Sequence, residues 1–312
     1  MITTKNANRK FKLGMHSYTL HLSGCGESWG FQSEGKTYAF EKVLTMEKLM
    51  DLAVEEGIEV LHITLVDLDD MSPEHLASIK AGAEERGIDL ELNISFNAPS
   101  DPRVNCTIED SLEIAHAIGA KLVKYSTDVE HPHPISHSSM CPEAMEQMSK
   151  IVMDFKRNIP TIEKYNLKIA IENHCDLFSD EVIWMVEKLN HPLIGACCDT
   201  INSLMLAEGI EECVRKMAPY CYCVHFCDNR VFADPDGTHS LGCAIGDGDV
   251  DVIEVMKILR EQAPEELDTI DLEIELPLSG YTIEDGRKEE IAAMRKSIKY
   301  MHEVLDIGIK GR

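Results

Sequence analysis

Eight short apolar runs alternate along this chain with amphipathic helical stretches. The runs span residues 12–18, 60–65, 90–95, 121–126, 168–172, 194–199, 221–226 and 270–276. Between them, apolar residues recur at three- and four-residue spacing, as in 45–57 and 106–119, which is the period of a helix. Eight strand–helix units of about 39 residues each fill the 312 residues and can close into a parallel barrel. We therefore predict an α/β fold, a single (β/α)8 TIM barrel.

An open, doubly wound sheet is the alternative for such a pattern. That fold usually carries a Gly-rich phosphate loop after its first strand, and the segment HSYTLHLSGCGESWG does not match that fingerprint. No stretch rich in Pro, Gly or Ser divides the chain, so residues 1–312 are expected to form one domain. Long loops are predicted near 20–44, 127–142 and 228–248, at the barrel face where active sites lie.

Charge and hydropathy exclude several classes of partner. The chain has 55 acidic and 30 basic residues, a formal net charge of −25. Nucleic acid and anionic membrane surfaces are therefore unfavourable partners, because both require a basic footprint. No apolar run approaches the roughly 20 residues of a membrane span. The first residues lack the apolar stretch of a signal peptide. We expect a cytoplasmic protein that binds a small molecule.

The 11 cysteines are odd in number and scattered, and many lie inside apolar runs. A disulfide scaffold would be shorter and rich in loops. Cys221, Cys223 and Cys227 suggest zinc, and strand alternation puts the first two on one face. Structural zinc sites usually contain CxxC pairs, so we favour thiols packed in the core.

Four potential metal ligands stand at the ends of the last four predicted strands: Glu172, Asp199, His225 and Glu275. Side chains alternate along a strand, and this parity turns Glu172, His225 and Glu275 toward the barrel axis. A single acid at a strand end is more often a cap or a salt-bridge partner, but four on consecutive strands favour ligation. Oxygen ligands and one imidazole suit one divalent cation, Mn²⁺ first, with Mg²⁺, Co²⁺ or Zn²⁺ as alternatives. Glu273 shares the inward face but lies one layer deeper, so Glu275 is the expected ligand.

The segments IAIENHCDLFSDE, GACCDTINSL, VHFCDNR and GDGDVD resemble the xylose-isomerase-like barrel superfamily of sugar isomerases and epimerases. The resemblance covers nearly the whole chain. It implies the same four ligands, and it implies that Glu172 and Glu275 also pass protons at opposite faces of a substrate. Asn202 stands where several epimerases have a histidine after the aspartate, which argues against a simple ketose epimerase.

Two earlier segments, GMHSYTLHLSGCGESWGF and VKYSTDVEHPHPISHSSMCPEAM, are similar to the larger subunit of bacterial C-glycoside deglycosidases. Those enzymes use this barrel to cleave a 3-keto sugar from an aromatic aglycone. This resemblance implies a small β-rich partner subunit and a higher oligomer.

Further polar groups belong to the predicted mouth. His131, His133 and His137 crowd the loop after the fourth strand, as a catalytic base or as a solvated loop. His137 is our first choice as the base, since neutral imidazole titrates near working pH. Lys124 either reaches an enolate oxygen or balances nearby carboxylates.

His174, Asn202 and Arg230 flank the ligand strands and are expected to bind substrate hydroxyls. His16 and His62 also face inward, but a lone strand histidine is more often a hydrogen-bonded core group.

Three functions remain open. The first is a carbon–carbon lyase that cleaves a 3-keto C-glycoside by β-elimination after a proton is removed next to the sugar carbonyl. The second is a sugar isomerase, epimerase or inosose dehydratase, and the third is a non-catalytic sugar-binding protein. His137 is the first candidate for the base, and Glu172 or Glu275 the second. An apurinic endonuclease of this barrel group would need more histidines and a surface suited to DNA, and a dehydrogenase would need a nucleotide fingerprint.

Overall fold

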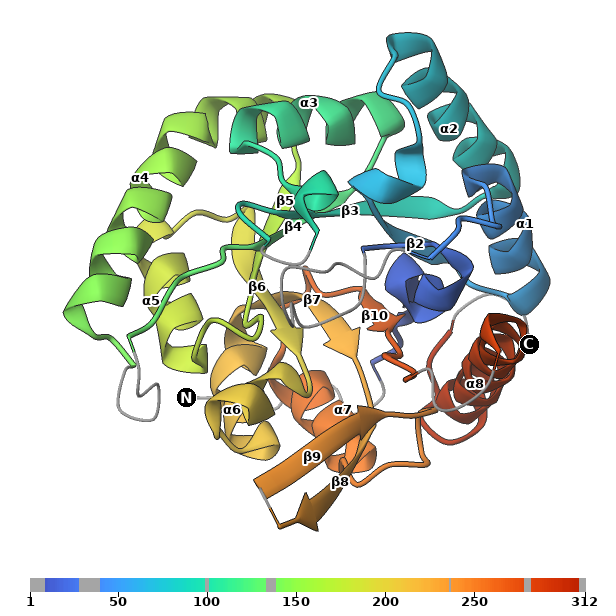
Figure 1. Cartoon of the computed structure of the whole chain (residues 1–312). Coiled ribbons are helices and arrows are strands. Elements are labelled where there is room, and N and C mark those ends of the chain that lie inside the picture. Colours follow the sequence, from blue (N-terminus) through green and yellow to red (C-terminus); the bar gives the residue numbers. More distant parts are fainter. Residues whose placement is uncertain are drawn as a thin grey trace.

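The computed structural model describes residues 9–27, 40–98, 101–132, 139–235, 237–277 and 282–308. Eight parallel strands close into a barrel in the order β1-β10-β7-β6-β5-β4-β3-β2, so the predicted (β/α)8 TIM barrel is confirmed (Figure 1). The barrel strands are β1 Lys12–His16, β2 Val60–Thr64, β3 Asp89–Ser95, β4 Leu122–Ser126, β5 Lys168–Glu172, β6 Ile194–Asp199, β7 Cys221–Phe226 and β10 Thr269–Leu272.

Helices surround the barrel, and each follows a strand (Figure 1). The α-helices are α1 Met46–Glu56, α2 Pro73–Arg86, α3 Ile108–Ile118, α4 Pro142–Tyr165, α5 Ser179–Leu189, α6 Ile210–Met217, α7 Val252–Gln262 and α8 Ile283–Glu303. Short 3-10 helices are η1 Ser17–Ser23, η2 Leu65–Leu68, η3 Pro102–Val104, η5 Asn202–Leu206 and η6 Ala218–Tyr220. No described helix combines the length and the apolar character that crossing a bilayer would require.

The ends of these helices follow from local sequence. In α3, the Thr107 side chain accepts a hydrogen bond from the Asp110 backbone N–H, which satisfies a free donor of the first turn. Gly119 ends the helix with a φ of 73°, a left-handed conformation that glycine adopts without a steric cost. The chain can then turn directly into β4.

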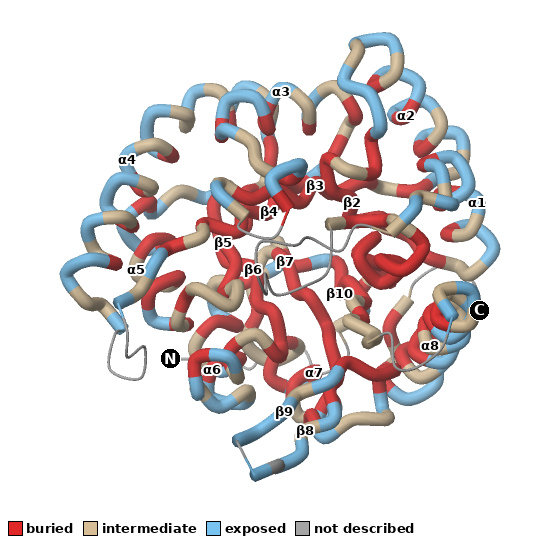
Figure 2. The backbone as a smooth tube through the Cα atoms, viewed as in Figure 1, coloured by how far each residue is buried: buried red, intermediate tan, exposed pale blue. Residues whose placement is uncertain are grey.

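The main apolar core lies between the strands and the helices. Side chains such as Leu61, Ile63, Ile169 and Val224 are fully buried there, and Figure 2 shows the barrel buried while the outer helix faces are exposed. Among the described residues, a small separate apolar group lies in the barrel interior, namely Leu122, Ala170, Cys197 and Cys223. The other side chains that face the barrel axis are largely polar, as expected if a polar binding site lies along that axis.

Three local features differ from the sequence prediction. First, β1 ends at His16 and continues as η1, and β10 ends at Leu272, so both strands are shorter than predicted. Second, the expected loop 228–248 contains an antiparallel hairpin of β8 Asn229–Asp234 and β9 Gly237–Gly242.

Third, the register between β6 and β7 shifts after Ala196, which pairs with Cys221, whereas the next pair is Cys197 with Cys223. The shift puts Cys221 in the outer core and Cys223 in the inner group. The prediction that both thiols share one face is therefore wrong. All 11 cysteines are free, as the absence of a disulfide scaffold predicts.

Candidate active site at the barrel mouth

A cavity of about 440 Å³ lies at the carboxyl ends of the barrel strands. Its described lining comes from β1, β3, β4, β5, β6 and β7 and from the segment that follows β10. This volume is within the usual range of small-molecule sites. The lining is rich in acidic, imidazole and amide groups rather than in apolar side chains, which suits a sugar-like ligand with many hydroxyls.

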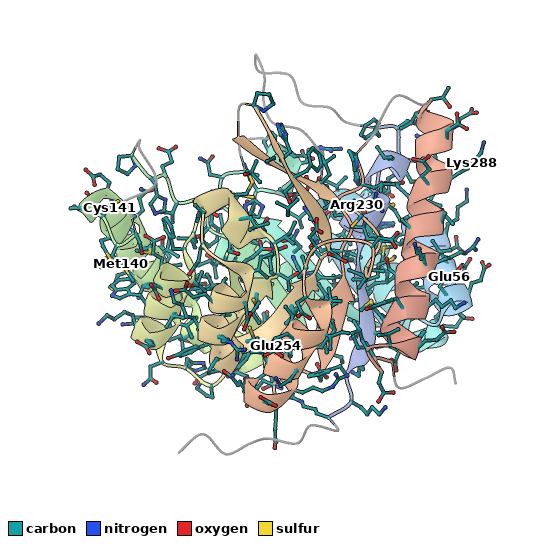
Figure 3. The ribbon with its side chains drawn as sticks, turned by 90° about the horizontal axis from the view of Figure 1, so that it is seen from below. Glu56, Met140, Cys141, Arg230, Glu254 and Lys288 are labelled. Atoms are coloured by element: carbon teal, nitrogen blue, oxygen red, sulfur yellow. The ribbon has the colours of Figure 1, made fainter. Side chains whose placement is uncertain are left out.

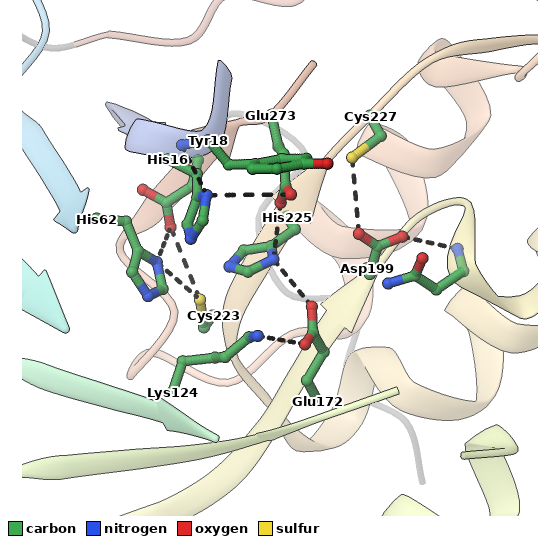
Figure 4. Close-up of polar contacts among 12 residues, drawn as sticks. His16, Tyr18, His62, Lys124, Glu172, Asp199, Cys223, His225, Cys227 and Glu273 are labelled. Atoms are coloured by element: carbon green, nitrogen blue, oxygen red, sulfur yellow. Dashed lines mark hydrogen bonds and ion pairs between the residues drawn. The ribbon is translucent and has the colours of Figure 1, made fainter. Parts of the chain in front are cut away.

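Four side chains meet at the floor of this cavity (Figure 4). Glu172 and Asp199 are the last residues of β5 and β6, and His225 is the next-to-last residue of β7. His225 Nδ1 lies 2.9 Å from Glu172 Oε1 and 2.8 Å from Glu273 Oε2. Potential ligand atoms of Glu172, Asp199 and His225 all lie within 4.8 Å of one another, and so do those of Asp199, Glu273 and Cys227.

Glu273, rather than Glu275, occupies the fourth position of this cluster. Because β10 ends at Leu272, the next residue already lies at the level of the mouth. The Glu273 backbone N–H donates to the Phe226 carbonyl (3.1 Å), which holds Glu273 beside His225. Glu275 lines the same cavity. The parity argument assumed a longer strand; metal ligation and catalysis by Glu275 stay predictions.

The donor set fits a divalent cation. One imidazole hydrogen on His225 Nδ1 cannot bond well to two carboxylates at once, and the buried Glu273 Oε2 atom has no hydrogen-bond partner. An octahedral cation with ligands at about 2.1 Å keeps neighbouring ligand atoms about 3.0 Å apart. The observed 2.9 Å and 2.8 Å spacings match that requirement. Thus the oxygen-rich set suits a hard or borderline cation.

Electrostatics also favour a cation at this point. Burial and the Glu273 and Glu172 charges raise the pKa of Asp199 to about 8. Burial alone would raise the pKa of Glu273, but the neighbouring His225 lowers it to about 2. Three carboxylates therefore compete for one imidazolium, and a divalent ion would relieve their mutual repulsion.

Hydrogen bonds fix the orientation of Asp199. Its Oδ1 atom accepts from the backbone N–H groups of Ile201 and Asn202, both at 2.7 Å. The Asn173 side chain accepts from the Asp199 N–H (2.7 Å) and donates to the Asp199 carbonyl (3.1 Å). Such outer contacts orient metal ligands. Sequence reasoning gave Asn173 no role, although its position directly after Glu172 was the available signal.

Lys124 lies next to the cluster and is buried. Its ammonium contacts Glu172 and donates to Ser126 Oγ (2.8 Å), and Ser126 Oγ donates to Glu172 Oε2 (3.0 Å). Burial alone would lower the pKa of Lys124, but the Glu172 charge raises it. Lys124 therefore stays cationic and can act as a donor but not as a base. Its predicted catalytic role stays a prediction.

The predicted substrate-binding residues lie in different places. His174 and Asn202 line the cavity, whereas Arg230 is exposed on the β8–β9 hairpin and donates to the Asp247 carbonyl (3.2 Å) (Figure 3). His174 Nδ1 lies 3.6 Å from Asp176 Oδ1. Although burial opposes its charge, Asp176 and Glu172 raise the pKa of His174 to about 10. Arg230 is not among the described residues that line the cavity.

The loop histidines separate into two groups. His133 and His137 lie outside the described residues, so the choice of His137 as the base stays a prediction. The His131 side chain is buried, and its Nε2 atom lies 3.0 Å and 3.1 Å from the two Glu181 carboxylate oxygens. Glu181 Oε1 also accepts from the Met140 N–H (2.8 Å). His131 therefore anchors the loop after β4 to the start of α5.

Tyr18 and Glu27 also line the cavity and were not predicted as site residues. Tyr18 follows β1, and its backbone N–H donates to His16 Nδ1 (3.2 Å). The available signal was parity, because Tyr18 lies two residues after the inward-facing His16.

Sequence comparison identifies distant relatives. A family model described as the xylose isomerase-like TIM barrel matches residues 50–303. The chain is 24% identical over 261 residues to the uncharacterized protein YihM of Escherichia coli, which covers 80% of this chain and 70% of that protein. It is 23% identical over 222 residues to 3-oxo-isoapionate decarboxylase of Pectobacterium atrosepticum; the alignment covers 70% of this chain and 74% of that protein.

Solved structures share the fold at low sequence identity. D-psicose 3-epimerase, solved in the presence of D-fructose, has a TM-score of 0.62 and 15% identity, covering 93% of this chain and 97% of that chain. The IOLI protein with a zinc atom has a TM-score of 0.60 and 16% identity, covering 92% and 98%. A Mycobacterium smegmatis protein of this barrel type, in complex with magnesium, has a TM-score of 0.60 and 13% identity, covering 94% and 99%.

Proposed function

The chain belongs to the xylose isomerase-like TIM barrel family, and we propose that it is a divalent-cation-dependent enzyme that forms an enolate next to a sugar carbonyl. The observation that carries this proposal is the convergence of Glu172, Asp199 and Glu273 on His225 beside a polar cavity. A sugar-binding protein that performs no chemistry has no need for so many buried carboxylates. The supporting comparisons are relatives and neighbours named as an epimerase and a decarboxylase.

Glu172, Asp199, His225 and Glu273 would hold the cation. We propose Mn²⁺ first, with Mg²⁺, Co²⁺ and Zn²⁺ as alternatives, since the oxygen-rich donor set accepts all four. When bound, a divalent cation supplies a Lewis acid that polarises a carbonyl and stabilises the charge of an enolate oxygen.

We assign the proton abstraction to the Glu273 carboxylate. Its side chain is 15% exposed, against 2% for Glu172, so it is the more accessible of the two carboxylates beside His225. Its low pKa keeps it ionised. With Oε2 beside His225, we assign the proton transfer from the carbon next to the carbonyl to Oε1, which lies 4.0 Å from His16 Nδ1. His137 and Glu275 stay predictions beside this assignment, and the Glu273→Gln and Glu275→Gln variants discussed below separate the two glutamates.

Lys124 and His174 complete the charge arrangement. The Lys124 ammonium forms an ion pair with Glu172, the other glutamate beside His225, and adds positive charge near a developing oxyanion. The raised pKa of His174 keeps its imidazole protonated at neutral pH, and it lines the cavity. It can therefore donate a proton to a leaving group, which a weaker acid such as Tyr18 does less readily.

Our first choice of reaction is a lyase acting on a 3-keto C-glycoside. Glu273 takes the proton from C2, and the electron pair becomes the C2–C3 enolate. The enolate then expels the aglycone carbon from C1, and that carbon takes the His174 proton. Asn202 lines the cavity, and its amide cannot act as a base. Its presence supports elimination, which needs one base, over an epimerisation that would use a second base at this position.

A sugar isomerase, epimerase or dehydratase is the second candidate. It is favoured by the two glutamates beside His225 Nδ1, since an epimerase needs an acid and a base at opposite faces of one carbon. In that reaction the proton returns to the same or to the neighbouring carbon and no bond to an aglycone breaks.

We further propose that the chain assembles with a small β-rich subunit in a higher oligomer. The β8–β9 hairpin projects from the carboxyl end of β7, and Phe232 and Leu241 on it are 46% and 40% exposed. Light scattering and co-purification test this idea. A fully active monomer at micromolar concentration would contradict it.

The test of function is a product assay with the cation-loaded protein. Candidate substrates are a 3-keto C-glycoside, the matched 3-keto O-glycoside, a free ketohexose and a β-keto sugar acid. Release of the aglycone supports the lyase, and epimerised or isomerised sugar supports the second candidate. Failure of the loaded protein to convert any of these compounds, or equal conversion after chelation, would contradict the proposal.

A further inference from the structure

A second group of potential ligands lies inside the barrel, one layer below the mouth cluster. His62 on β2, Glu91 on β3, Cys223 on β7 and Asp271 on β10 face inward. His62 and Asp271 are fully buried, and Cys223 and Glu91 are 2% and 6% exposed. Figure 4 shows His62 and Cys223 beside His16 and His225 but apart from Asp199. We call these four residues the inner cluster.

The spacing within the inner cluster is too long for strong hydrogen bonds. His62 Nδ1 lies 3.4 Å from Glu91 Oε2, 3.7 Å from Asp271 Oδ2 and 3.9 Å from Cys223 Sγ. Cys223 Sγ lies 3.7 Å from Asp271 Oδ2. Four such atoms lie within 4.8 Å of one another, so all four surround one small point.

These distances match tetrahedral coordination. A zinc ion bound at about 2.0–2.3 Å by nitrogen, oxygen and sulfur keeps neighbouring ligand atoms about 3.3–3.6 Å apart. The four separations given above, 3.4–3.9 Å, begin within that range and exceed it by at most a few tenths of an ångström. The mouth cluster, with separations of 2.8 Å and 2.9 Å, has the tighter spacing of an octahedral site.

Several polar atoms of the inner cluster have no hydrogen-bond partner. These include Glu91 Oε2 and Asp271 Oδ1. Among the described residues, the ion-pair contacts of both carboxylates are with His62, and no Lys or Arg reaches either one. One imidazole cannot neutralise two buried carboxylates, and buried charge that is not neutralised is unfavourable. A cation at this point would therefore stabilise the cluster.

The neighbouring strand leaves room for this arrangement. Gly14 on β1 faces Asp271, and a Cβ atom there would lie 1.9 Å from Asp271 Oδ1. The glycine thus admits a carboxylate into a position where a larger residue would fill the barrel core.

We propose that His62, Glu91, Cys223 and Asp271 form a second cation site inside the barrel, separate from the mouth, that binds Zn²⁺ through one sulfur, one nitrogen and two oxygen ligands. The soft thiolate and the imidazole favour zinc over manganese or magnesium. The bound ion ties β2, β3, β7 and β10 together beneath the active site and neutralises the buried carboxylates. Because binding removes the thiol proton, loading releases protons.

The test uses the full chain, loaded with zinc and dialysed against a chelator. In an Asp199→Asn background, which weakens the mouth, we expect about one zinc ion per chain by elemental analysis. X-ray absorption spectroscopy at the zinc edge should show one sulfur atom at about 2.3 Å from the zinc ion. The neighbour should be lost in Cys223→Ser and retained in Cys227→Ser, the matched control because Cys227 adjoins the mouth.

Three results would overturn the site. They are no retained zinc in the Asp199→Asn protein, zinc without a sulfur neighbour, or a sulfur signal that Cys227→Ser abolishes and Cys223→Ser leaves intact. If Cys223→Ser does not fold, Glu91→Gln provides the second variant, expected to reduce retained zinc at least tenfold. If neither variant folds, the Cys227→Ser protein gives the decision: a retained sulfur neighbour supports the site, and its loss overturns the site. Because none of these measurements uses a substrate, their outcome is independent of the proposed reaction.

Discussion

Replacement of Glu273 by glutamine separates the two glutamates at the end of β10. Glutamine keeps the shape of the side chain but removes its negative charge and its basicity. In the structure that charge lies 2.8 Å from His225 Nδ1, so Glu273→Gln should weaken divalent-cation binding. Glu275 is the matched control, because it lines the same cavity two residues further along the chain.

The expected magnitudes follow from the contacts. Removing only an outer partner of a metal ligand typically costs 10–100-fold in affinity, or about 1.4–2.7 kcal/mol, and loss of a direct ligand should cost at least as much. Loss of a positioned base lowers turnover by about 10²–10⁴-fold. Glu275→Gln should change cation affinity by about twofold, since substitutions outside key contacts cost about 0.5 kcal/mol or less.

Titration calorimetry with Mn²⁺ measures the first effect without a substrate, and the product assay measures the second. Circular dichroism confirms that both variants fold. If Glu275→Gln loses the cation and Glu273→Gln keeps it, our reading of the mouth is wrong and the original sequence prediction of Glu275 stands. Equal, small losses in both variants would refute a ligand role for either glutamate.

Three further predictions follow from other contacts. Asp199→Asn should weaken cation binding at least tenfold in calorimetry; unchanged binding would remove Asp199 from the ligand set. A hydrogen bond to Glu181 raises the pKa of His131, so this ion pair stabilises the fold fully below about pH 6.5 and less as the pH rises through the raised value. His131→Gln should therefore lower the melting temperature more at pH 6 than at pH 9, and a constant difference would contradict the assignment. Gly14→Ala should destabilise the fold by about 1–3 kcal/mol in urea titration. Gly209→Ala, with its nearest neighbour 4.0 Å from the added Cβ, should cost less, about 0.5 kcal/mol, because it only replaces a favourable N-cap residue of α6.

The sequence was sufficient for the barrel and for three residues of the mouth. Periodicity of two placed Glu172 and His225 on the inner face, and both lie where their strands end. Such local rules work in a parallel barrel because every strand is buried on both faces and each ends at the same rim.

The remaining features depend on contacts between distant segments. The segment after β10 packs against β9: the Gly242 backbone lies against the Glu275 backbone, where a Cβ would come within 2.2 Å of a carbonyl oxygen. No local pattern in IDLEIEL marks the end of β10, so strand parity favoured Glu275 over Glu273 at the mouth; both line the cavity, and ligation by Glu275 stays a prediction. The exposed position of Arg230 has the same origin, because the β8–β9 hairpin carries it outward. The shift between β6 and β7 likewise cannot be read from CYCVHF alone.

The central claim, formation of an enolate next to a sugar carbonyl, is tested most directly by hydrogen exchange at that carbon. The cation-loaded protein is incubated in D₂O with a keto sugar, and proton NMR follows the hydrogen next to the carbonyl. In a parallel assay, the rate on a 3-keto glycoside is compared with the rate on the same compound deuterated at that carbon. Our account predicts deuterium incorporation, or a primary isotope effect on product release, and loss of either signal after chelation. Turnover in which the product keeps that hydrogen and gains no deuterium would indicate hydride transfer and would contradict the account.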